Sequence, residues 1–114
     1  MPADLIPPTF TCTVQPERQR VRVVLAGELD IETEPVVERQ LDELREVGFV
    51  DLVLDLGGLS FADSTAVNLV LRWTRAAEAQ GWHFEVAPGT GTAAELLSFT
   101  GVLEHLALDG PRRF

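Results

Sequence analysis

An apolar run of strand length, residues 51–56, places the strongest constraint on the fold. Its near-continuous hydrophobicity is typical of a central strand that is covered on both faces, and Gly57-Gly58 is expected to end it. Amphipathic segments on either side predict helices over residues 34–47 and 64–80. Helices that connect successive strands act as crossovers between parallel strands, so this part of the chain predicts an α/β fold.

The chain is predicted to begin with a hairpin. Residues 9–15 and 20–26 read as strands, and the residues around Pro16 read as the turn between them. Alternation along the first strand places Cys12 on the same face as Phe10 and Val14. We therefore interpret Cys12 as a small buried hydrophobic residue and not as a reactive thiol.

The C-terminal part is predicted to complete the sheet. Its expected elements are a strand at 83–87, a helix at 93–100 that begins with the capping box Thr92 to Glu95, and a short edge at 106–108. We expect one mixed β-sheet of about four to five strands with helices packed against it. The expected domain covers residues 9–109, between a flexible N-terminal lead at 1–8 and a C-terminal tail at 110–114.

The acidic composition narrows the range of partners. Nine basic residues against eighteen acidic ones give a net charge of −9, which repels nucleic-acid backbones and anionic lipid surfaces. We therefore expect neither nucleic acid nor a membrane as a partner. The single cysteine excludes an internal disulfide, and no basic and apolar leader opens the sequence, so the expected compartment is the cytoplasm.

The helix expected over residues 64–80 is apolar around more than half of its circumference, which a single buried stripe does not explain. In one interpretation, the helix is wedged between the sheet and a neighbouring helix. In the other, part of its second apolar stripe, Leu69 and Trp73 in particular, is an exposed docking surface. The sequence leaves both interpretations open.

Ser64 stands at the start of this helix, directly after its expected N-cap, Asp63; Thr33 is the expected N-cap of the earlier helix. Backbone N–H groups and the positive end of the helix dipole accommodate a phosphate at such a position. Asp30, Asp55 and Asp63 are expected to approach Ser64, because open α/β sheets place their sites at the carboxyl ends of strands. A serine at a helix start is also common without any further role.

Enzyme and cofactor sites find little support in the sequence. Ser64 lacks a G-x-S-x-G elbow, and neither His83 nor His105 has a spacing that identifies it as a catalytic base. Histidines, cysteine and carboxylates show no metal-ligand spacing, so we expect no catalytic residue, no cofactor and no metal. The segment Gly89-Thr90-Gly91 matches part of a dinucleotide-binding pattern, but no second nucleotide-binding half follows, and we interpret it as a turn.

Three short motifs follow one another in the chain: Gly27-Glu28-Leu29-Asp30, residues 52–56, and Phe61-Ala62-Asp63-Ser64-Thr65. Their order and separations resemble the STAS domain of bacterial anti-sigma factor antagonists, and the similarity covers about residues 10–108. The resemblance implies a STAS-like fold and a binding protein that is not an enzyme. Its implied partner is an anti-sigma factor of the histidine-kinase-like ATPase type, which on binding releases its sigma factor.

The resemblance also implies a switch at Ser64. The partner would phosphorylate Ser64 and so break the complex, and a serine phosphatase acting on phospho-Ser64 would restore binding. The expected partner-binding residues are Asp30, Asp63, Ser64, Thr65, Leu69 and Trp73. Ala66 and Val67 stand where the family pattern has Gly and Leu. Two alternatives are a STAS scaffold or regulatory subunit that is never phosphorylated and, in another class, a small nucleotide-binding protein or enzyme.

Overall fold

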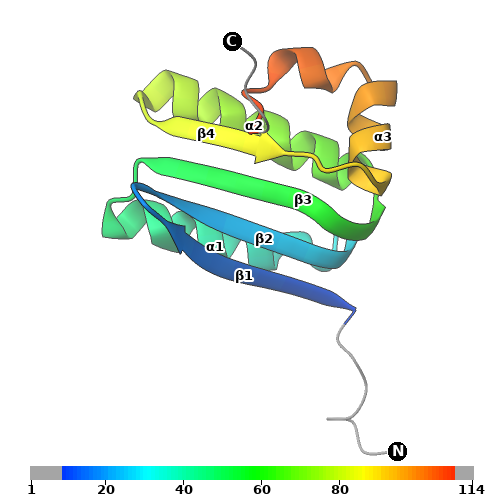
Figure 1. Ribbon diagram of the computed structural model, residues 1–114, viewed down its shortest axis with the longest axis horizontal. Coiled ribbons are helices and arrows are strands. Elements are labelled where there is room, and N and C mark those ends of the chain that lie inside the picture. Colours follow the sequence, from blue (N-terminus) through cyan, green and yellow to red (C-terminus); the bar gives the residue numbers. More distant parts are fainter. Residues whose placement is uncertain (1–8, 110–114) are drawn as a thin grey trace, which may run out of the picture.

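The computed structural model describes residues 9–109 and shows an α/β arrangement (Figure 1). The expected lead at 1–8 and tail at 110–114 lie outside the described residues. The elements in chain order are β1 (Phe10–Glu17), β2 (Arg20–Leu29), α1 (Glu34–Val47), β3 (Asp51–Ala62), α2 (Ser64–Gln80), β4 (His83–Ala87), α3 (Thr92–Phe99) and the short 3₁₀ helix η2 (Val102–His105).

The four strands form one mixed sheet in the order β1-β2-β3-β4. β1 pairs with β2 in an antiparallel hairpin, whereas β2–β3 and β3–β4 are parallel pairs joined by α1 and α2. This confirms the predicted mixed sheet. The short edge expected at residues 106–108 is a single parallel bridge between Leu108 and Val86.

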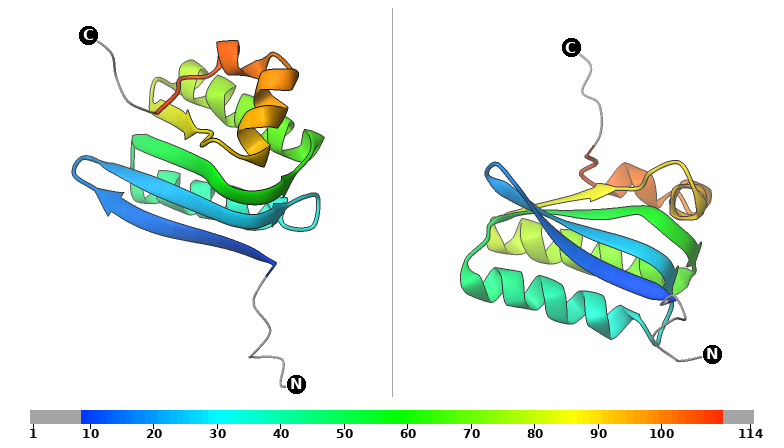
Figure 2. Two further views of the ribbon diagram at one scale, coloured as in Figure 1. Left: turned by 45° about the vertical axis from the view of Figure 1, so that its right-hand side comes forward. Right: turned by 60° about the horizontal axis from the view of Figure 1, so that its bottom comes forward.

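The core lies between the sheet and the layer formed by α1 and α2, which cover the same sheet face (Figure 2). Alternate strand residues point into it, including Val23, Leu25, Leu52 and Leu54, all fully buried. Each such side chain contributes about 1.5–3 kcal/mol through burial. Cys12 is half-buried against this core, and burial raises the pKa of its thiol, as expected for a structural cysteine.

Gly57 and Gly58 do not end the third strand, contrary to the prediction. β3 continues through both glycines to Ala62, and its register against β2 shifts twice. From Asp55 to Gly58, β3 advances by three residues while its partner β2 advances by only two. β3 contains a second extra residue between Leu59 and Phe61. A Cβ at Gly58 would lie 2.8 Å from the carbonyl oxygen of Leu25, so this bulge requires glycine.

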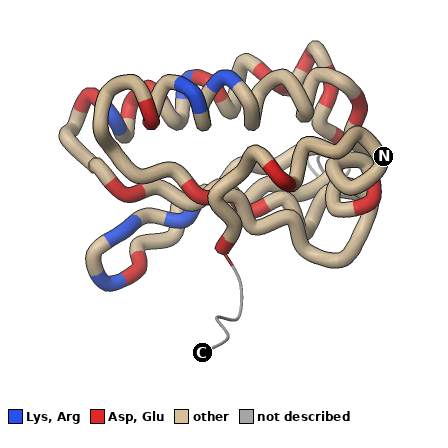
Figure 3. Tube along the Cα trace, turned by 90° about the horizontal axis from the view of Figure 1, so that it is seen from above, with Lys and Arg blue, Asp and Glu red and all other residues tan. Residues whose placement is uncertain are grey.

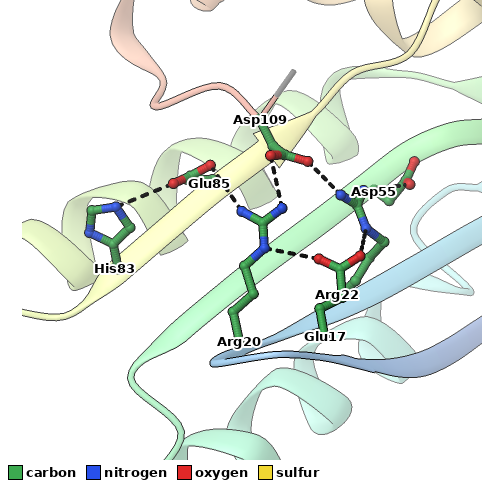
Figure 4. A network of polar contacts seen from close by, with 7 residues as sticks. All are labelled: Glu17, Arg20, Arg22, Asp55, His83, Glu85 and Asp109. Carbon is green, nitrogen blue, oxygen red and sulfur yellow. Dashed lines mark hydrogen bonds and ion pairs between the residues drawn. The ribbon is translucent and has the colours of Figure 1, made fainter. Parts of the chain in front are cut away.

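The opposite face of the sheet carries no helix and is covered by an ion-pair network (Figure 4). Arg22 bonds to Glu17 at 2.8 Å and to Asp55 at 2.8 Å, and Arg20 contacts Glu17, Glu85 and Asp109. Val53 lies on this face and is fully buried. The run at 51–56 is therefore covered on both faces, as predicted, but one of its covers consists of charged side chains.

The three helix starts compare differently with the prediction. Thr33 occupies the N-cap position of α1, as predicted, but makes no side-chain cap bond; its hydroxyl donates to the carbonyl oxygen of Glu28. Thr92 is the first residue of α3 and not its cap, because Gly91 occupies that position and no side-chain cap bond forms. Asp63, in contrast, caps α2 as predicted, accepting a 2.9 Å hydrogen bond from the backbone N–H of Thr65.

Candidate functional site at the start of α2

The last residue pair between β2 and β3 brings two aspartates to one edge of the sheet. Leu29 pairs with Ala62, and Asp30 and Asp63 directly follow these residues. Because the strands are parallel, both aspartates stand at the carboxyl-terminal edge, where Ser64 begins α2. The structure thus places Asp30, Asp63 and Ser64 at the same edge.

The side chain of Ser64 is exposed, whereas Asp63 and Thr65 on either side of it are half-buried. Asp63 accepts two hydrogen bonds from the first turn of α2, one with its side chain and one with its backbone carbonyl. Its carboxylate accepts from the N–H of Thr65, and its carbonyl accepts from the N–H of Ala66 at 3.0 Å. A group attached to Ser64 would therefore meet a helix N-terminus that already holds one negative charge.

Asp30 organises the turn between β2 and α1. Its Oδ1 accepts hydrogen bonds from the backbone N–H groups of Glu32, at 2.9 Å, and Thr33, at 3.1 Å. These contacts form a local Asx-type turn that fixes the carboxylate beside the sheet edge. Asp30 has a structural role in addition to its position near Ser64.

Asp55 does not approach Ser64, contrary to the prediction. It lies within β3, where Arg22 binds its carboxylate and the N–H of Gly57 donates to it at 2.9 Å. Seven residues of extended strand separate it from Ala62, a span of roughly 23 Å. The prediction failed because it ended the strand at Gly57-Gly58.

Leu69 and Trp73 are not exposed, so they do not form the predicted docking stripe. Leu69 is 0% exposed and Trp73 is 9% exposed. The indole N–H of Trp73 donates to Glu38 of α1 at 3.1 Å, and its ring packs edge-on against Trp82. The second apolar stripe of α2 is therefore explained by packing between the sheet and α1, the other interpretation that the sequence left open.

Ala66, which replaces the glycine of the family pattern, points into the core. Its side chain is 1% exposed and belongs to the central hydrophobic cluster. The extra methyl group therefore adds no bulk to the surface around Ser64. It fills space beneath the first turn of α2 instead.

Two exposed apolar side chains flank the edge and were missed as candidate site residues. Ile31, next to Asp30, is 77% exposed, and Phe61, two residues before Asp63, is 43% exposed. Both residues are large and hydrophobic in the sequence, but they were predicted to lie in connecting segments. The face of Phe61 could not be predicted because it depends on the second register shift between β2 and β3.

The charges near Ser64 are predominantly negative. The seven arginines within the described residues lie in the β1–β2 hairpin, in α1 or in the second half of α2 (Figure 3). None stands in the sequence segments 28–33 or 59–66 that make this edge, whereas Glu28, Asp30, Glu32 and Asp63 all do. A phosphate at Ser64 would add charge to an edge that is already acidic.

The described residues show no arrangement of three or more His, Cys, Asp or Glu side chains suited to a metal ion. His83 contacts Glu85 on the helix-free face. The turn at Gly89 has a packing explanation, since a Cβ there would lie 2.5 Å from the Cα of Gly57. Within the described chain, no helix has both the length and the apolar character needed to cross a membrane.

These features define a small α/β domain with an exposed serine at the first position of a capped crossover helix. Residues 12–108 match the family described as "Mlab, STAS domain". The chain belongs to this STAS domain family. A search of curated proteins gave no match.

Solved structures of similar fold include several anti-sigma factor antagonists. The antagonist SpoIIAA in its unphosphorylated form matches with a TM-score of 0.70 and 22% identity over 88% of this chain and 89% of that one. The phosphorylated form of SpoIIAA, from Bacillus, matches with a TM-score of 0.65, 22% identity and coverage of 88% and 92%.

Two further structures extend this comparison. An anti-sigma factor antagonist from Mycobacterium paratuberculosis has a TM-score of 0.67 and 21% identity over 87% of this chain and 84% of that one. A serine-to-glutamate variant of RsbS from Moorella thermoacetica has a TM-score of 0.69 and 20% identity, with coverage of 89% and 87%. At these identities the likeness establishes the shared fold.

Proposed function

We propose that the chain is an anti-sigma factor antagonist that is switched off by phosphorylation at Ser64. The observation that carries the proposal is the exposed hydroxyl of Ser64, presented at the start of α2 in a STAS domain. The similar fold of antagonists solved by others, one of them in both phosphorylation states, supports it. The chain acts by binding and performs no catalysis of its own.

The partner is an anti-sigma factor of the histidine-kinase-like ATPase type, and a serine phosphatase reverses the modification. The docking surface centres on Ser64, Asp30, Asp63 and Thr65, with Ile31 and Phe61 as its apolar contacts. Exposed large apolar side chains beside a polar centre are the arrangement that protein partners desolvate. Leu69 and Trp73 are buried and take no part in this surface. Since the reaction consumes ATP, the cytoplasm is the proposed compartment.

Phosphorylation weakens the complex by electrostatics and desolvation. A phosphoserine carries about −1.5 to −2 charges at neutral pH. Part of this charge is stabilised by the N-terminus of α2, but the Asp63 carboxylate already occupies that position. A partner that buries Ser64 would have to desolvate both charges, which costs binding free energy.

The direct test is to incubate the purified chain with ATP and with each ATPase-type anti-sigma factor from the same source. We expect mass spectrometry to find one phosphate on Ser64, and Ser64→Ala to abolish it. Ser98→Ala, which changes an exposed serine of α3, is the matched control and should be phosphorylated normally. A partner that binds the chain without phosphorylating Ser64 would refute the switch and favour the scaffold function.

A second test measures binding directly. Ser64→Asp should weaken the anti-sigma complex by at least about tenfold, equivalent to 1.4 kcal/mol, while leaving the circular dichroism spectrum unchanged. Ser98→Asp carries the same charge change away from the proposed surface and should bind like the unmodified chain. Equal affinities of all three proteins would contradict the proposed docking surface.

A further inference from the structure

The two outer strands of the sheet differ in how their free edges are covered. β1 forms one edge and β4 the other (Figure 1). β4 is short and carries His83 and Glu85. It is covered at Val86, whose backbone bonds to that of Ala107 at 2.8 Å and to that of Asp109 at 2.9 Å. In the described part of the chain, no backbone hydrogen bond reaches the outer edge of β1, so this edge is open.

The register with β2 shows which backbone groups of β1 point outward. The carbonyl oxygen of Thr9 accepts a hydrogen bond from the N–H of Glu28 at 2.7 Å, and the pairing then continues without a shift along β1. Bonded and non-bonded pairs alternate in an antiparallel ladder, so the odd-numbered residues of β1 bond to β2. The N–H and C=O groups of Phe10, Cys12 and Val14 therefore face the open edge.

The open edge lacks the features that normally prevent an edge strand from pairing with another chain. Such strands are usually very short, bulged or charged. β1 has 8 residues in regular register and no charged residue before Glu17, whose carboxylate is bound by Arg20 and Arg22. Pro16 belongs to the outward set and has no N–H, as is common for proline on an edge strand. The segment available for pairing is therefore 10–14.

We propose that β1 pairs with the β1 strand of a second copy of this chain. The two strands run antiparallel about a two-fold axis at Cys12, so that Cys12 lies opposite its own copy and Phe10 lies opposite Val14 of the second copy. Each of these pairs exchanges two backbone hydrogen bonds, and the two sheets become one continuous sheet. Only this register pairs all of the outward residues of the segment with one another.

The side chains of the paired segment suit this symmetric arrangement. Phe10, Cys12 and Val14 are half-buried against the core, so pairing sets Phe10 beside Val14 of the second copy and extends their burial. On the other face, the exposed Thr11 lies opposite Thr13 of the second copy. Pairs of an aromatic with a β-branched residue, and pairs of threonines, stabilise antiparallel neighbours. No charged side chains meet along the segment.

The neighbouring flank of α1 adds apolar surface on the same side of the molecule. Val36 and Val47 are 45% and 77% exposed. They lie on the side of α1 opposite Glu34 and Glu38, the two residues that pair with Arg72 of α2. Because α1 contacts β1 whereas α2 contacts β4, this flank lies towards the open edge. In the dimer it faces the same flank of the second copy across the extended sheet.

The dimer keeps the two Ser64 surfaces apart. Ser64 stands at the carboxyl-terminal edge of the parallel strands, whereas β1 runs along the side of the sheet. The two-fold axis reverses the strand direction, so the Ser64 surfaces lie at opposite ends of the extended sheet. The proposed association depends neither on phosphorylation nor on the identity of the partner that binds at Ser64.

Single-cysteine variants test the register. Thr11→Cys and Thr13→Cys are each prepared in a Cys12→Ala background; both positions are exposed, so both proteins should fold. In the proposed dimer, the Cα atoms of position 11 and position 13 of the second copy are about 4.5 Å apart, within disulfide range, whereas like positions are about 8 Å apart. We expect mild oxidation to cross-link the equimolar mixture at least about tenfold more than either variant alone. Equal cross-linking in the three samples, or none in the mixture, would overturn the proposal.

Sedimentation equilibrium of the full chain measures the association itself. We expect the mass to rise with concentration towards that of two chains. Val14→Pro removes an outward N–H without removing a bond to β2, and should weaken association at least about tenfold more than Val14→Ala, which keeps the N–H. Circular dichroism checks that both variants fold. A mass of one chain at concentrations up to about 1 mM, or equal association of the two variants, would contradict the proposal.

A second pair of variants makes the test independent of whether Val14→Pro folds. Thr11→Lys with Thr13→Lys adds, at exposed positions of β1, the charge that natural edge strands carry. Thr90→Lys with Ser98→Lys adds the same charge at exposed positions away from this edge. We expect the first double variant to remain a monomer and the second to associate like the unmodified chain. The same behaviour in both double variants would show that β1 is not the interface.

Discussion

Arg22 in β2 binds Asp109 at the end of the described chain and so ties the C-terminal segment to the helix-free face of the sheet (Figure 4). Arg20 holds the other carboxylate oxygen of Asp109 at 3.0 Å. The backbone N–H of Asp109 also donates to the carbonyl oxygen of Val86 at 2.9 Å. One residue thus joins the two central arginines to the edge strand β4.

This network predicts a loss of stability in acid. Partial burial alone would raise the pKa of Asp109, but hydrogen bonds from Arg22 and Arg20 outweigh it and lower the pKa. Hydrogen bonds from Arg22 and Arg20 also lower the pKa of Glu17. Since both folded pKa values lie below the unfolded ones, about 4, the stabilisation is present above pH 4 and is lost as the pH falls through the folded values.

The variant Asp109→Asn tests this contribution. Its free energy of unfolding should be about 1 kcal/mol below that of the unmodified chain at pH 7. Urea unfolding between pH 7 and pH 3 should show this difference shrinking as Asp109 becomes protonated. Glu104→Gln, at an exposed position, is the control and should show little difference at any pH. A difference that stayed constant with pH would indicate a packing effect and not an ionic one.

Trp73→Ala should destabilise the fold, because this side chain is packed between the sheet and α1. Removal of a buried tryptophan costs about 3–5 kcal/mol. Chemical denaturation followed by circular dichroism measures the change. Phe99→Ala is the matched aromatic control, since Phe99 is 92% exposed and its loss should cost less than about 0.5 kcal/mol. Similar losses for the two variants would contradict the packing described for Trp73.

Gly89→Ala should be costly because the β4–α3 turn passes directly over β3. Gly89 has φ +73°, and an added Cβ would lie 2.5 Å from the Cα of Gly57. We expect a loss of more than about 2 kcal/mol, from backbone strain together with the clash. Gly91→Ala, in the same turn, has no atom within 4 Å of its added Cβ and should change stability little. Thermal unfolding of the two variants measures the contrast.

Ala66→Gly restores the family residue and separates its structural role from recognition. The change should lower the free energy of unfolding by about 1–2 kcal/mol, through weaker helix propensity and a lost buried methyl group. Because the methyl group of Ala66 does not reach the surface, the rate of Ser64 phosphorylation by the proposed partner should stay the same. A faster reaction in the glycine variant would show that Ala66 limits the approach of the kinase.

Much of the fold follows from local signals in the sequence. The hairpin, the two crossover helices and the strand at 83–87 have the periodicity of their elements, and Asp63 has the chemistry of an N-cap. Gly48 and Gly81 end their helices in the left-handed region that glycine favours. These features depend on neighbouring residues, which is why one sequence sufficed to predict them.

The errors concern contacts between residues far apart in the chain. Gly57-Gly58 has the composition of a strand end, but β3 continues because β2 supplies pairing partners along the whole segment. This continuation moved Asp55 away from the site and turned Phe61 towards solvent. The stripe of α2 that holds Trp73 could be either packed or exposed, and only the position of α1 decides between the two interpretations. The arginine network likewise joins residues from both ends of the described chain.

The two register shifts determine which side chains face the core in the segment between Asp55 and Asp63. A change in the length of this segment by an odd number of residues therefore differs in effect from a change by an even number. Leu56 faces the core before the first shift and Leu59 faces it afterwards. After the second shift, Phe61 faces outward. Since side chains alternate, each single-residue insertion or deletion here would exchange the inward and outward sets, whereas changes in pairs would preserve them. Within this family, alignment gaps in this segment should therefore occur in even numbers wherever the serine at the start of α2 keeps its place.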